Sequence, residues 1–428
     1  MKKHLPWISI LILSLVVHFA YFGHPRETVF DEVHFGKFVS GYFTHEYFFD
    51  IHPPLGKRII SGAAKLAGFQ PGFSFGTIGD QFPDDTYLAM RFLPSLAGML
   101  LPLVIYFLCL RLGFSRWAAW LAGILLVLDN ALLVQSRFIL LDSFLLLFGF
   151  LSWLFYAKFR ETNSNYYLLF TACSAGLAFS VKWTGATFLL IILILEIKRL
   201  PAGKAGWKNL LILAVVPFAI YFSLFALHFA LLKNPGPGDA FMKQDFQQKP
   251  LMAKFLELNA EMYRSNARLT ATHPYSTLPP AGYQKLDWYT WPLMMRPIYY
   301  WNHVMARIYF LGNPLVWWAG TLGIITLLFS LRPKSPKLAF LIAGAYALNL
   351  LPFVGIPRAM FLYHYLTAMI ISVIALAYII DQHPNKQKIA IGLASVAFIF
   401  FIFFAPLSYG LPLSDNAYHL RTWLPSWE

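Results

Sequence analysis

Apolar runs long enough to cross a bilayer recur along the whole of this 428-residue chain, and they constrain its fold more than any other feature. A helix needs about 20 predominantly apolar residues to span the hydrocarbon core of a membrane, and a repeated run of this kind marks a membrane protein. Only 13% of the residues are charged, against roughly 25% in an ordinary soluble domain. The sequence therefore predicts an all-α polytopic membrane protein.

The formal charge of +14 follows a membrane pattern and not a nucleic-acid-binding one. Lys and Arg cluster in short connectors between apolar runs, as the positive-inside rule predicts for cytoplasmic loops. They do not form a basic face interleaved with aromatic residues, so we expect no nucleic-acid partner. Cys109 and Cys173 fall inside predicted spans, which disfavours a disulfide framework or a cysteine-based metal site.

The alternation of apolar runs with basic connectors predicts about eleven spans, with the N-terminus in the cytoplasm and the C-terminus outside. Lys2 and Lys3 precede the first run, and no small-residue cleavage site follows it, so we interpret this run as a retained span. The fifth and sixth spans are short, and the sequence does not fix their boundaries. The spans cover about residues 5–22, 86–110, 117–134, 138–157, 166–181, 186–197, 210–232, 314–331, 338–354, 360–380 and 389–406.

Two predicted outer segments are too long to be simple turns. Residues 23–85 are rich in acidic side chains and include an amphipathic stretch at about residues 55–69. Residues 233–312 begin with an Asn-Pro-Gly-Pro-Gly run, continue into a predicted amphipathic helix at about 240–269, and end in an aromatic-rich stretch. Amphipathic helices and aromatic belts of this kind lie along the membrane interface. We expect one integral-membrane domain over residues 1–428.

Under this topology, the charged residues near the membrane gather at the outer ends of spans or in the outer loops. Snorkelling side chains would instead occupy both ends about equally, so the gathering predicts a polar cavity that opens outward. Any single member could still form a structural pair, as Arg137 could with Asp129 or Asp142. The set comprises Asp31, Glu32, His52, Arg91, Asp129, Arg137, Asp142, Lys182, His273, Arg296, Arg358 and His364.

Carboxylates and cations in one cavity indicate a class of reaction. Arg grips a phosphate through two N–H groups and Lys supplies a point charge, while a carboxylate can accept the proton of a hydroxyl nucleophile. The combination favours inverting transfer from a phosphate-linked donor to a hydroxyl. Asp31 and Glu32 lack the spacing of a metal motif, and the histidines show no HExxH-like pattern. We therefore expect no metal and no cofactor.

Seven blocks of sequence, in one order from residue 30 to residue 366, resemble the protein O-mannosyltransferase family. They are FDEVHFGKF…YFFDIHPPLGK, RFLPSLAG, LDNALLVQSRFILLDSFLLLF, SVKWTG, LTATHPYST, WPLMMRPIYYW and MFLYHYL. The resemblance implies a membrane glycosyltransferase with the GT-C fold that needs no metal. Such an enzyme moves mannose from a polyprenyl-phosphate donor to Ser or Thr of a translocating polypeptide, on the non-cytoplasmic face.

The resemblance also implies roles for individual residues. Asp31 would be the catalytic base, and Glu32 would help to position the acceptor. Arg91 would be needed for activity and would bind the donor phosphate. Lys182, His273 and Arg296 would line the donor pocket, and the predicted outward cavity adds His52, Arg137 and His364 to the substrate-binding set.

One departure from the family pattern concerns residues 233–312. Eukaryotic members carry a β-trefoil MIR domain in this outer loop, and about 80 residues are too few to hold it. We therefore expect a bacterial-type member in the cytoplasmic (inner) membrane, with its polypeptide acceptor emerging from the translocon. The sequence leaves open the identity of the sugar, the acceptor sequence, the polyprenyl chain length and the oligomeric state.

Two alternatives compete with this interpretation. A related GT-C enzyme that glycosylates a lipid such as lipid A would share the acidic first loop and the phosphate grip, but HPPLGK and WPLMMRPIYYW favour the protein mannosyltransferase. A transporter could use the same charges as an ion path. It would be expected to show inverted repeats or paired broken helices in its two halves, and the sequence shows neither.

Overall fold

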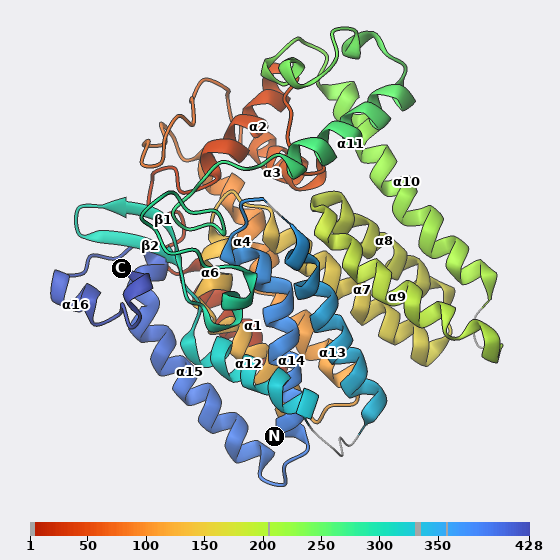
Figure 1. Ribbon diagram of the computed structural model, residues 1–428, viewed down its shortest axis with the longest axis vertical. Helices are drawn as coiled ribbons and strands as arrows, with labels where there is room; N and C mark the ends of the chain where they lie inside the picture. Colours follow the sequence, from red (N-terminus) through yellow and green to blue (C-terminus); the bar gives the residue numbers. More distant parts are fainter. Residues whose placement is uncertain (1–4, 204–205, 330–334, 357) are drawn as a thin grey trace. The chain divides into compact units, whose positions relative to one another are not determined.

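The computed structural model describes residues 5–203, 206–329, 335–356 and 358–428 (Figure 1). Lys2 and Lys3, on which part of the predicted orientation rests, lie outside the described residues. The chain divides into two compact units. Unit 1 comprises Met1–Pro25, Gly98–Arg137 and Thr270–Glu428, and unit 2 comprises Arg26–Ala97 and Phe138–Leu269.

Unit 2 contains the acidic first loop and a group of apolar helices. α7, α8, α9 and α10 pack on one another, α2 packs on α3, and α11 packs on α10. The helices are α2 (Glu32–Thr44), α3 (Leu55–Leu66), α4 (Thr86–Arg111), which continues into unit 1, α7 (Asp142–Thr162), α8 (Asn165–Val181), α9 (Ala186–Ile197), α10 (Trp207–Leu231) and α11 (Leu251–Ala267). Short 3-10 turns are η1 (Trp183–Gly185), η2 (Leu200–Ala202), η3 (Pro237–Phe241) and η4 (Phe246–Gln248).

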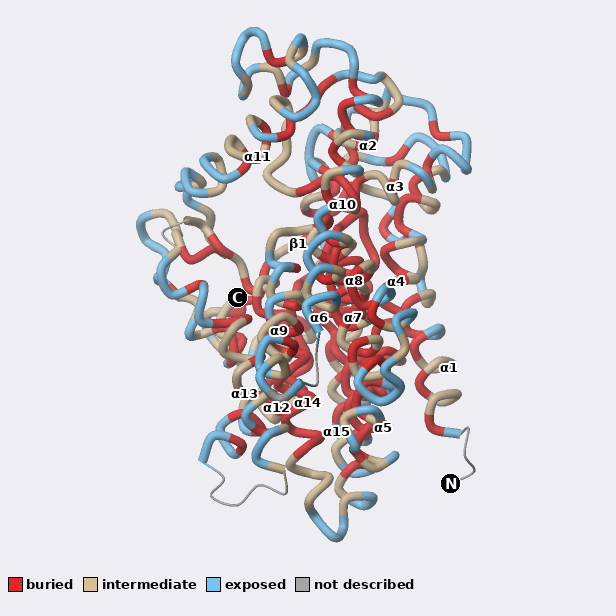
Figure 2. Tube along the Cα trace, turned by 90° about the vertical axis from the view of Figure 1, so that its right-hand side faces the viewer, coloured by how far each residue is buried: buried red, intermediate tan, exposed pale blue. Residues whose placement is uncertain are grey.

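Unit 1 is built around α14 (Leu366–Asp381), which is buried along most of its length (Figure 2) and packs on α5, α12 and α13. Its other helices are α1 (Leu5–Phe19), α5 (Arg116–Val127), α6 (Asn130–Arg137), α12 (Pro314–Phe329), α13 (Pro336–Leu350), α15 (Lys386–Tyr409) and α16 (Asp415–His419). The short turns are η5 (Trp288–Leu293), η6 (Leu351–Gly355), η7 (Leu362–Tyr365) and η8 (Pro425–Trp427), and β1 (Ile298–His303) pairs antiparallel with β2 (Ala306–Phe310).

A helix forms in each of the eleven predicted apolar segments, which confirms a helical, multi-pass membrane architecture. By length and composition, six helices among the described residues can cross a membrane, or seven if the bent pair α5–α6 is one span. The shorter apolar helices are α1, α12 and η1 joined to α9. The total of eleven spans stays a prediction.

The third predicted span differs from its expected form. A single helix over residues 117–134 and a turn at residues 135–137 were expected, but the helix breaks after Val127 and α6 bends by 56° from α5. Asp129 explains the break, because its carboxylate accepts the backbone N–H of Leu132 at 2.9 Å and so caps α6. The same carboxylate accepts Asn313 N–H at 3.0 Å and the Trp317 indole at 2.8 Å.

Two expectations for residues 233–312 were wrong in detail. The helix predicted over about 240–269 is limited to α11, because Pro250 precedes its first residue and cannot continue a backbone ladder. The aromatic-rich stretch also contains the β1–β2 hairpin, which the all-α prediction omitted. Its strands pair from Ile298 with Phe310 to His303 with Ala306, so some of the aromatic side chains pack on a sheet.

Candidate functional site

Asp31 and Glu32, adjacent at the start of α2, have different surroundings. Phe30 adopts a left-handed conformation with φ 48°, and the chain then enters α2 with Asp31 as its N-cap residue. The partly exposed Asp31 side chain forms no capping hydrogen bond. Within the described ranges, its carboxylate has no hydrogen-bond or ion-pair partner, whereas Glu32 is fully buried. The pair therefore presents one available carboxylate and one enclosed carboxylate.

The Glu32 carboxylate accepts four hydrogen bonds from the described part of the chain. Oε1 accepts Arg91 Nε at 2.8 Å and the backbone N–H of Ile139 at 2.9 Å. Oε2 accepts Arg91 Nη2 at 2.6 Å and the backbone N–H of Val29 at 2.8 Å. Both oxygens of Glu32 are thus occupied by structural hydrogen bonds, which fix the turn that carries Asp31.

Arg91 is enclosed as completely as its partner. Its side chain is 0% exposed, and its guanidinium lies 4.9–5.3 Å from the ring centroids of Phe82, Tyr87 and Phe138. Nη2 also donates to the Glu27 carbonyl at 2.7 Å. We expected Arg91 to bind the donor phosphate, but a phosphate has no access to it in this arrangement. The contacts instead make Arg91 the group that holds Glu32.

Lys182 and Asp142 form a second ion pair in unit 2. Lys182 Nζ donates to both carboxylate oxygens of Asp142, at 2.8 and 2.9 Å. Lys182 lies in extended backbone between α8 and η1, with φ −146°. Gly185 permits the turn that follows, because a Cβ there would lie 2.5 Å from the Ala178 backbone. The Ser-Val-Lys-Trp-Thr-Gly run thus presents a cation at the end of α8.

The charges of this ion pair act on Asp31. Burial raises the pKa of Asp31 to about 7; the positive charge of Lys182 opposes the rise, and the negative charges of Asp142 and Asp50 add to it. Near neutral pH, a carboxyl group with this pKa is present in both protonation states. It therefore meets the requirement for a general base, which is most effective when its pKa is close to the working pH.

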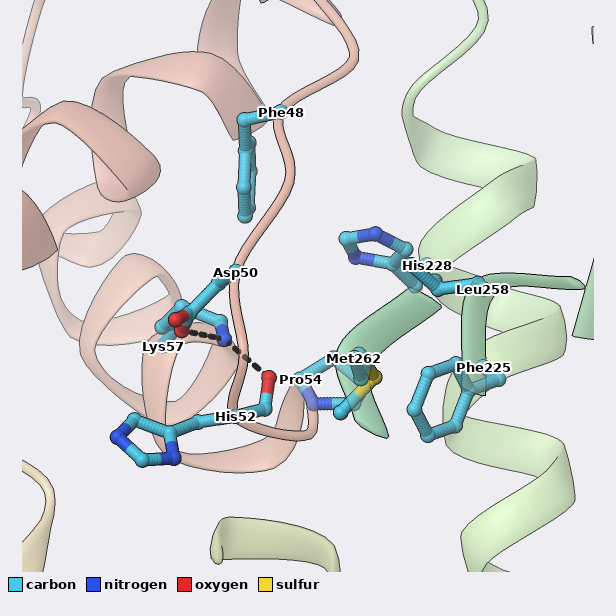
Figure 3. Close-up of a pocket in the computed structure, with 9 residues that line it drawn as sticks. All are labelled: Phe48, Asp50, His52, Pro54, Lys57, Phe225, His228, Leu258 and Met262. Carbon is cyan, nitrogen blue, oxygen red and sulfur yellow. Dashed lines mark hydrogen bonds and ion pairs between the residues drawn. The ribbon is translucent and has the colours of Figure 1, made fainter. Parts of the chain in front are cut away.

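The His-Pro-Pro-Leu-Gly-Lys run contains a third buried contact, shown in Figure 3. Lys57 Nζ donates to the Asp50 carboxylate, to the His52 carbonyl at 2.8 Å and to the Pro53 carbonyl at 3.2 Å. The sequence suggested that Lys57 belongs to an interfacial helix, but its side chain is 1% exposed. Three acceptors compensate its burial, and the contact fixes the loop before α3.

A small pocket lies beside this Lys57–Asp50 pair (Figure 3). The His52 imidazole points away from the wall formed by His228, and the His52 carbonyl faces Lys57. Tyr42 OH lies 2.9 Å from His228 Nδ1 and fixes that ring. The lining residues are Phe48, Asp50, His52, Pro54, Lys57, Phe225, His228, Leu258 and Met262.

In unit 1, His273, Arg296 and His364 gather around two loops. Arg296 Nη1 donates to the Pro274 carbonyl at 2.9 Å, and the His273 ring lies 5.2 Å from that of Phe361. The Phe361 backbone N–H donates to His364 Nδ1 at 3.1 Å. Burial lowers the pKa of His273 and of Arg296. The structure thus brings these three predicted residues to one region of unit 1.

Arg137, the remaining predicted site residue, lies at the end of α6 in unit 1. Nη1 donates to the Ala20 carbonyl at 2.8 Å, and Nη2 donates to the Tyr21 carbonyl at 2.7 Å. The guanidinium lies 4.5 Å from the ring centroid of Tyr409. These contacts join α6 to the chain after α1, and they favour the structural role that the sequence left open.

Sequence reasoning left Asp50, Lys57 and Asp142 out of the assigned site residues. The sequence does contain a pattern that could have indicated the contact between Asp50 and Lys57. The two residues flank Pro53-Pro54, and a turn at these prolines reverses the chain direction and brings the two side chains together. Asp142 was noticed only as one of the outer charges. Within the described ranges, no group of three or more His, Cys, Asp or Glu side chains is arranged to hold a metal ion.

The comparisons with known proteins agree on one family. A model of the "dolichyl-phosphate-mannose-protein mannosyltransferase" family matches residues 8–233, and a model of the "C-terminal four TMM region of protein-O-mannosyltransferase" matches residues 251–427. Protein O-mannosyltransferase 1 of Drosophila melanogaster is 36% identical over 257 residues, which are 56% of this chain and 29% of that protein. Dolichyl-phosphate-mannose–protein mannosyltransferase 4 of Candida albicans is 36% identical over 269 residues, 58% of this chain and 36% of that protein. The chain thus spans about a third of the length of these curated relatives.

Solved structures show the same fold. A chain of the Saccharomyces cerevisiae protein O-mannosyltransferase Pmt1-Pmt2 complex bound to the sugar donor superposes with a TM-score of 0.91 at 21% identity, covering 100% of this chain and 93% of that chain. The Archaeoglobus fulgidus oligosaccharyltransferase in its apo form gives a TM-score of 0.55 at 16% identity, covering 99% of this chain and 58% of that chain. The first family model alone covers more than half of the sequence. The chain therefore belongs to the dolichyl-phosphate-mannose–protein mannosyltransferase family, as the seven sequence blocks predicted.

Proposed function

We propose that this chain transfers mannose from a polyprenyl-phosphate-mannose donor to Ser or Thr hydroxyls of translocated polypeptides, with inversion at the anomeric carbon. Membership of the family supports the enzyme class and the mannosyl donor. The observation that carries the chemistry is Asp31, a carboxylate without a hydrogen-bond partner in the described chain and with a pKa of about 7. Such a group can accept the proton of an attacking hydroxyl near neutral pH.

In the proposed step, the hydroxyl oxygen of the acceptor forms a bond to C1 of mannose while the bond from C1 to the phosphate oxygen breaks. The hydroxyl proton passes to the Asp31 carboxylate, and the polyprenyl phosphate leaves with the bonding electron pair. A single displacement of this kind inverts C1. It draws its base and its charge stabilisation from side chains, so the proposal includes no metal and no cofactor.

The proposed roles of the other site residues follow their geometry. Lys182, whose charge acts on Asp31, is the first candidate for stabilising the leaving phosphate. His52, His273, Arg296 and His364 stay proposed ligands of the donor. Glu32 and Arg91 hold the turn at Asp31, and Arg137 holds α6.

The proposed location is the cytoplasmic (inner) membrane of a bacterium, with the active site and the C-terminus outside and the N-terminus in the cytoplasm. The basic connectors between apolar runs support this orientation. The length of residues 233–312 supports the bacterial assignment, and the acceptor is proposed to emerge from the translocon. These finer points rest on the sequence pattern.

A reconstituted transfer reaction tests the function. Purified protein in lipid vesicles is incubated with polyprenyl-phosphate-mannose and a Ser/Thr-rich peptide, and the peptide is examined by mass spectrometry. We expect one or more added hexoses, lost when the peptide hydroxyls are removed by Ser/Thr→Ala changes. Donor consumption with a lipid acceptor but not with peptide would refute a protein acceptor. No donor consumption with either acceptor would refute the transferase proposal.

The pH dependence of the transfer step should report the charge around Asp31. Since the base must be deprotonated, the single-turnover rate should rise as the pH passes through about 7. Lys182→Met removes a positive charge that lowers the pKa of Asp31, so the rising limb should move to higher pH. Asp142→Asn removes a negative charge that raises this pKa, so the limb should move to lower pH. Shifts in the same direction, or no shift in either variant, would contradict the assignment of Asp31 as base.

A further inference from the structure

Four consecutive backbone carbonyls at residues 292–295, between η5 and β1, accept hydrogen bonds from side chains that are distant in the sequence. Two of the donors belong to α12. The Trp318 indole donates to the Leu293 carbonyl at 3.0 Å. The Thr321 hydroxyl lies 2.9 Å from the Pro292 carbonyl and shares its hydrogen with a carbonyl of its own helix. α12 therefore holds the first half of the run.

The other two donors belong to η8, close to the C-terminal end of the chain. The Trp427 indole donates to the Met294 carbonyl at 2.8 Å, and the Ser426 hydroxyl donates to the Met295 carbonyl. The Trp427 side chain is 0% exposed, and its ring centroid lies 6.2 Å from that of Phe404 in α15. This segment is therefore inserted among the side chains of unit 1. We call the four donors the carbonyl clamp: Trp318, Thr321, Ser426 and Trp427.

The backbone that the carbonyl clamp holds has a strained conformation. Met294 is left-handed with φ 55°, and its side chain is 0% exposed. A residue other than glycine rarely adopts this conformation, which persists where the surrounding contacts fix it. Local contacts at Met294 contribute, because its N–H donates to the Trp291 carbonyl at 2.9 Å and its sulfur accepts the Gly312 N–H at 3.0 Å. The carbonyl clamp adds the remote contacts that specify the turn.

The turn leads directly to a proposed ligand of the donor. Arg296 is the second residue after Met294, and Pro297 follows it. A residue that precedes proline is restricted to extended backbone, and β1 begins at Ile298. The chain after Arg296 is thus fixed by the proline and the hairpin, and the chain before it is fixed by the carbonyl clamp.

The Arg296 guanidinium uses little of its hydrogen-bonding capacity within the protein. In the part of the chain that the structure describes, it has one hydrogen-bond acceptor, the Pro274 carbonyl, and no ion-pair partner. Its remaining N–H groups can bind two oxygens of a phosphate, provided that the side chain starts from the correct place. The position of the turn therefore determines what Arg296 can reach.

We propose that Ser426 and Trp427 are positioning residues for Arg296. They hold the carbonyls of Met294 and Met295, and through this turn they set the point from which the Arg296 side chain extends. The ligand that this placement serves is the phosphate of the lipid-linked sugar donor. The consequence for donor binding rests on the proposed function, whereas the effect on the turn does not.

Trp427→Phe tests the proposal on the full chain, because it keeps an aromatic ring and removes the N–H that donates to Met294. Amide hydrogen exchange over residues 291–300, followed by mass spectrometry without donor, should become faster than in the unmodified protein. The dissociation constant for polyprenyl-phosphate-mannose should rise by about three- to tenfold, the usual effect of one lost neutral hydrogen bond. Ser426→Ala, a smaller change at the neighbouring donor, should act in the same direction in both measurements.

Trp423→Phe is the matched control. It makes the same change in the same segment, but the Trp423 indole donates to the Leu420 carbonyl at 3.0 Å and not to the turn. Its amide exchange over residues 291–300 and its donor affinity should match those of the unmodified protein. Unchanged exchange in both Trp427→Phe and Ser426→Ala would overturn the proposal, and so would equally fast exchange in Trp427→Phe and Trp423→Phe.

A double-mutant cycle with Arg296→Gln shows whether Trp427 acts on the donor through Arg296. If it does, Trp427→Phe should weaken donor binding in the unmodified background and have little further effect in the Arg296→Gln background. Additive losses of donor affinity would overturn the proposal. Faster exchange in Trp427→Phe, together with a donor affinity that Arg296→Gln leaves unchanged, would refute Arg296 as a donor ligand under the proposed function and support the carbonyl clamp as the holder of the turn.

Discussion

Asp31→Asn should lower the rate of mannosyl transfer by about 10²–10⁴-fold, the usual contribution of general base catalysis. The amide keeps the shape of the side chain but cannot take the hydroxyl proton. Because the Asp31 carboxylate forms no hydrogen bond or ion pair within the described ranges, the change removes no structural contact. We therefore expect the donor dissociation constant and the melting temperature to stay close to those of the unmodified protein. Single-turnover transfer and equilibrium donor binding measure the two effects separately.

Asp85→Asn is the matched control for this experiment. It makes the same chemical change in the same connecting segment, at a carboxylate that is exposed and pairs with Arg26 at 3.4 Å. Transfer by this variant should equal that of the unmodified protein. Asp31→Glu, which restores a carboxylate on a longer side chain, should recover part of the lost rate. Full turnover by Asp31→Asn would show that another group accepts the proton.

The contrast between Asp31 and Glu32 shows what sequence reasoning could and could not reach. The acidic pair next to a membrane segment, together with the family resemblance, predicted a catalytic base and a neighbouring carboxylate with a different task. The partners that separate the two tasks are remote in sequence, since Arg91 lies 59 residues after Glu32 and Ile139 lies 107 residues after it. No local sequence pattern indicates those contacts. The sequence therefore led us to expect Arg91 to bind the donor phosphate and not Glu32.

The fold was predictable wherever one local signal dominated. Long apolar runs gave the helices, because only a helix satisfies its own backbone hydrogen bonds in lipid. The break between α5 and α6 was not predicted, because it depends on Asp129 finding Asn313 and Trp317, 184 and 188 residues away. The burial of Lys57 was not predicted either, because the amphipathic pattern of residues 55–69 indicated a helix at the membrane interface. Its burial follows from the return of the chain at Pro53 and Pro54, which brings Asp50 to its ammonium group.

Arg91→Met should destabilise the fold by about 3–5 kcal/mol, the usual cost of leaving one member of a buried ion pair without its partner. The change removes two hydrogen bonds from the Glu32 carboxylate, which then retains the backbone N–H groups of Val29 and Ile139. Met fills much of the space among the surrounding aromatic rings. The loss of folding stability should therefore come from the removed charge more than from a new cavity. Thermal melting in detergent, followed by intrinsic fluorescence, measures the destabilisation.

The double variant Arg91→Met with Glu32→Gln decides between the two roles of Arg91. A neutral Gln at position 32 no longer needs a counter-charge, and its carbonyl oxygen can still accept the Ile139 N–H. If Arg91 acts through Glu32, the double variant should regain much of the melting temperature lost in Arg91→Met and should regain donor binding with it. If Arg91 instead contacts the donor phosphate during turnover, stability should recover while the donor dissociation constant stays as high as in Arg91→Met. The second result would restore the role predicted from the sequence and would require the site to open around α4 when the donor binds.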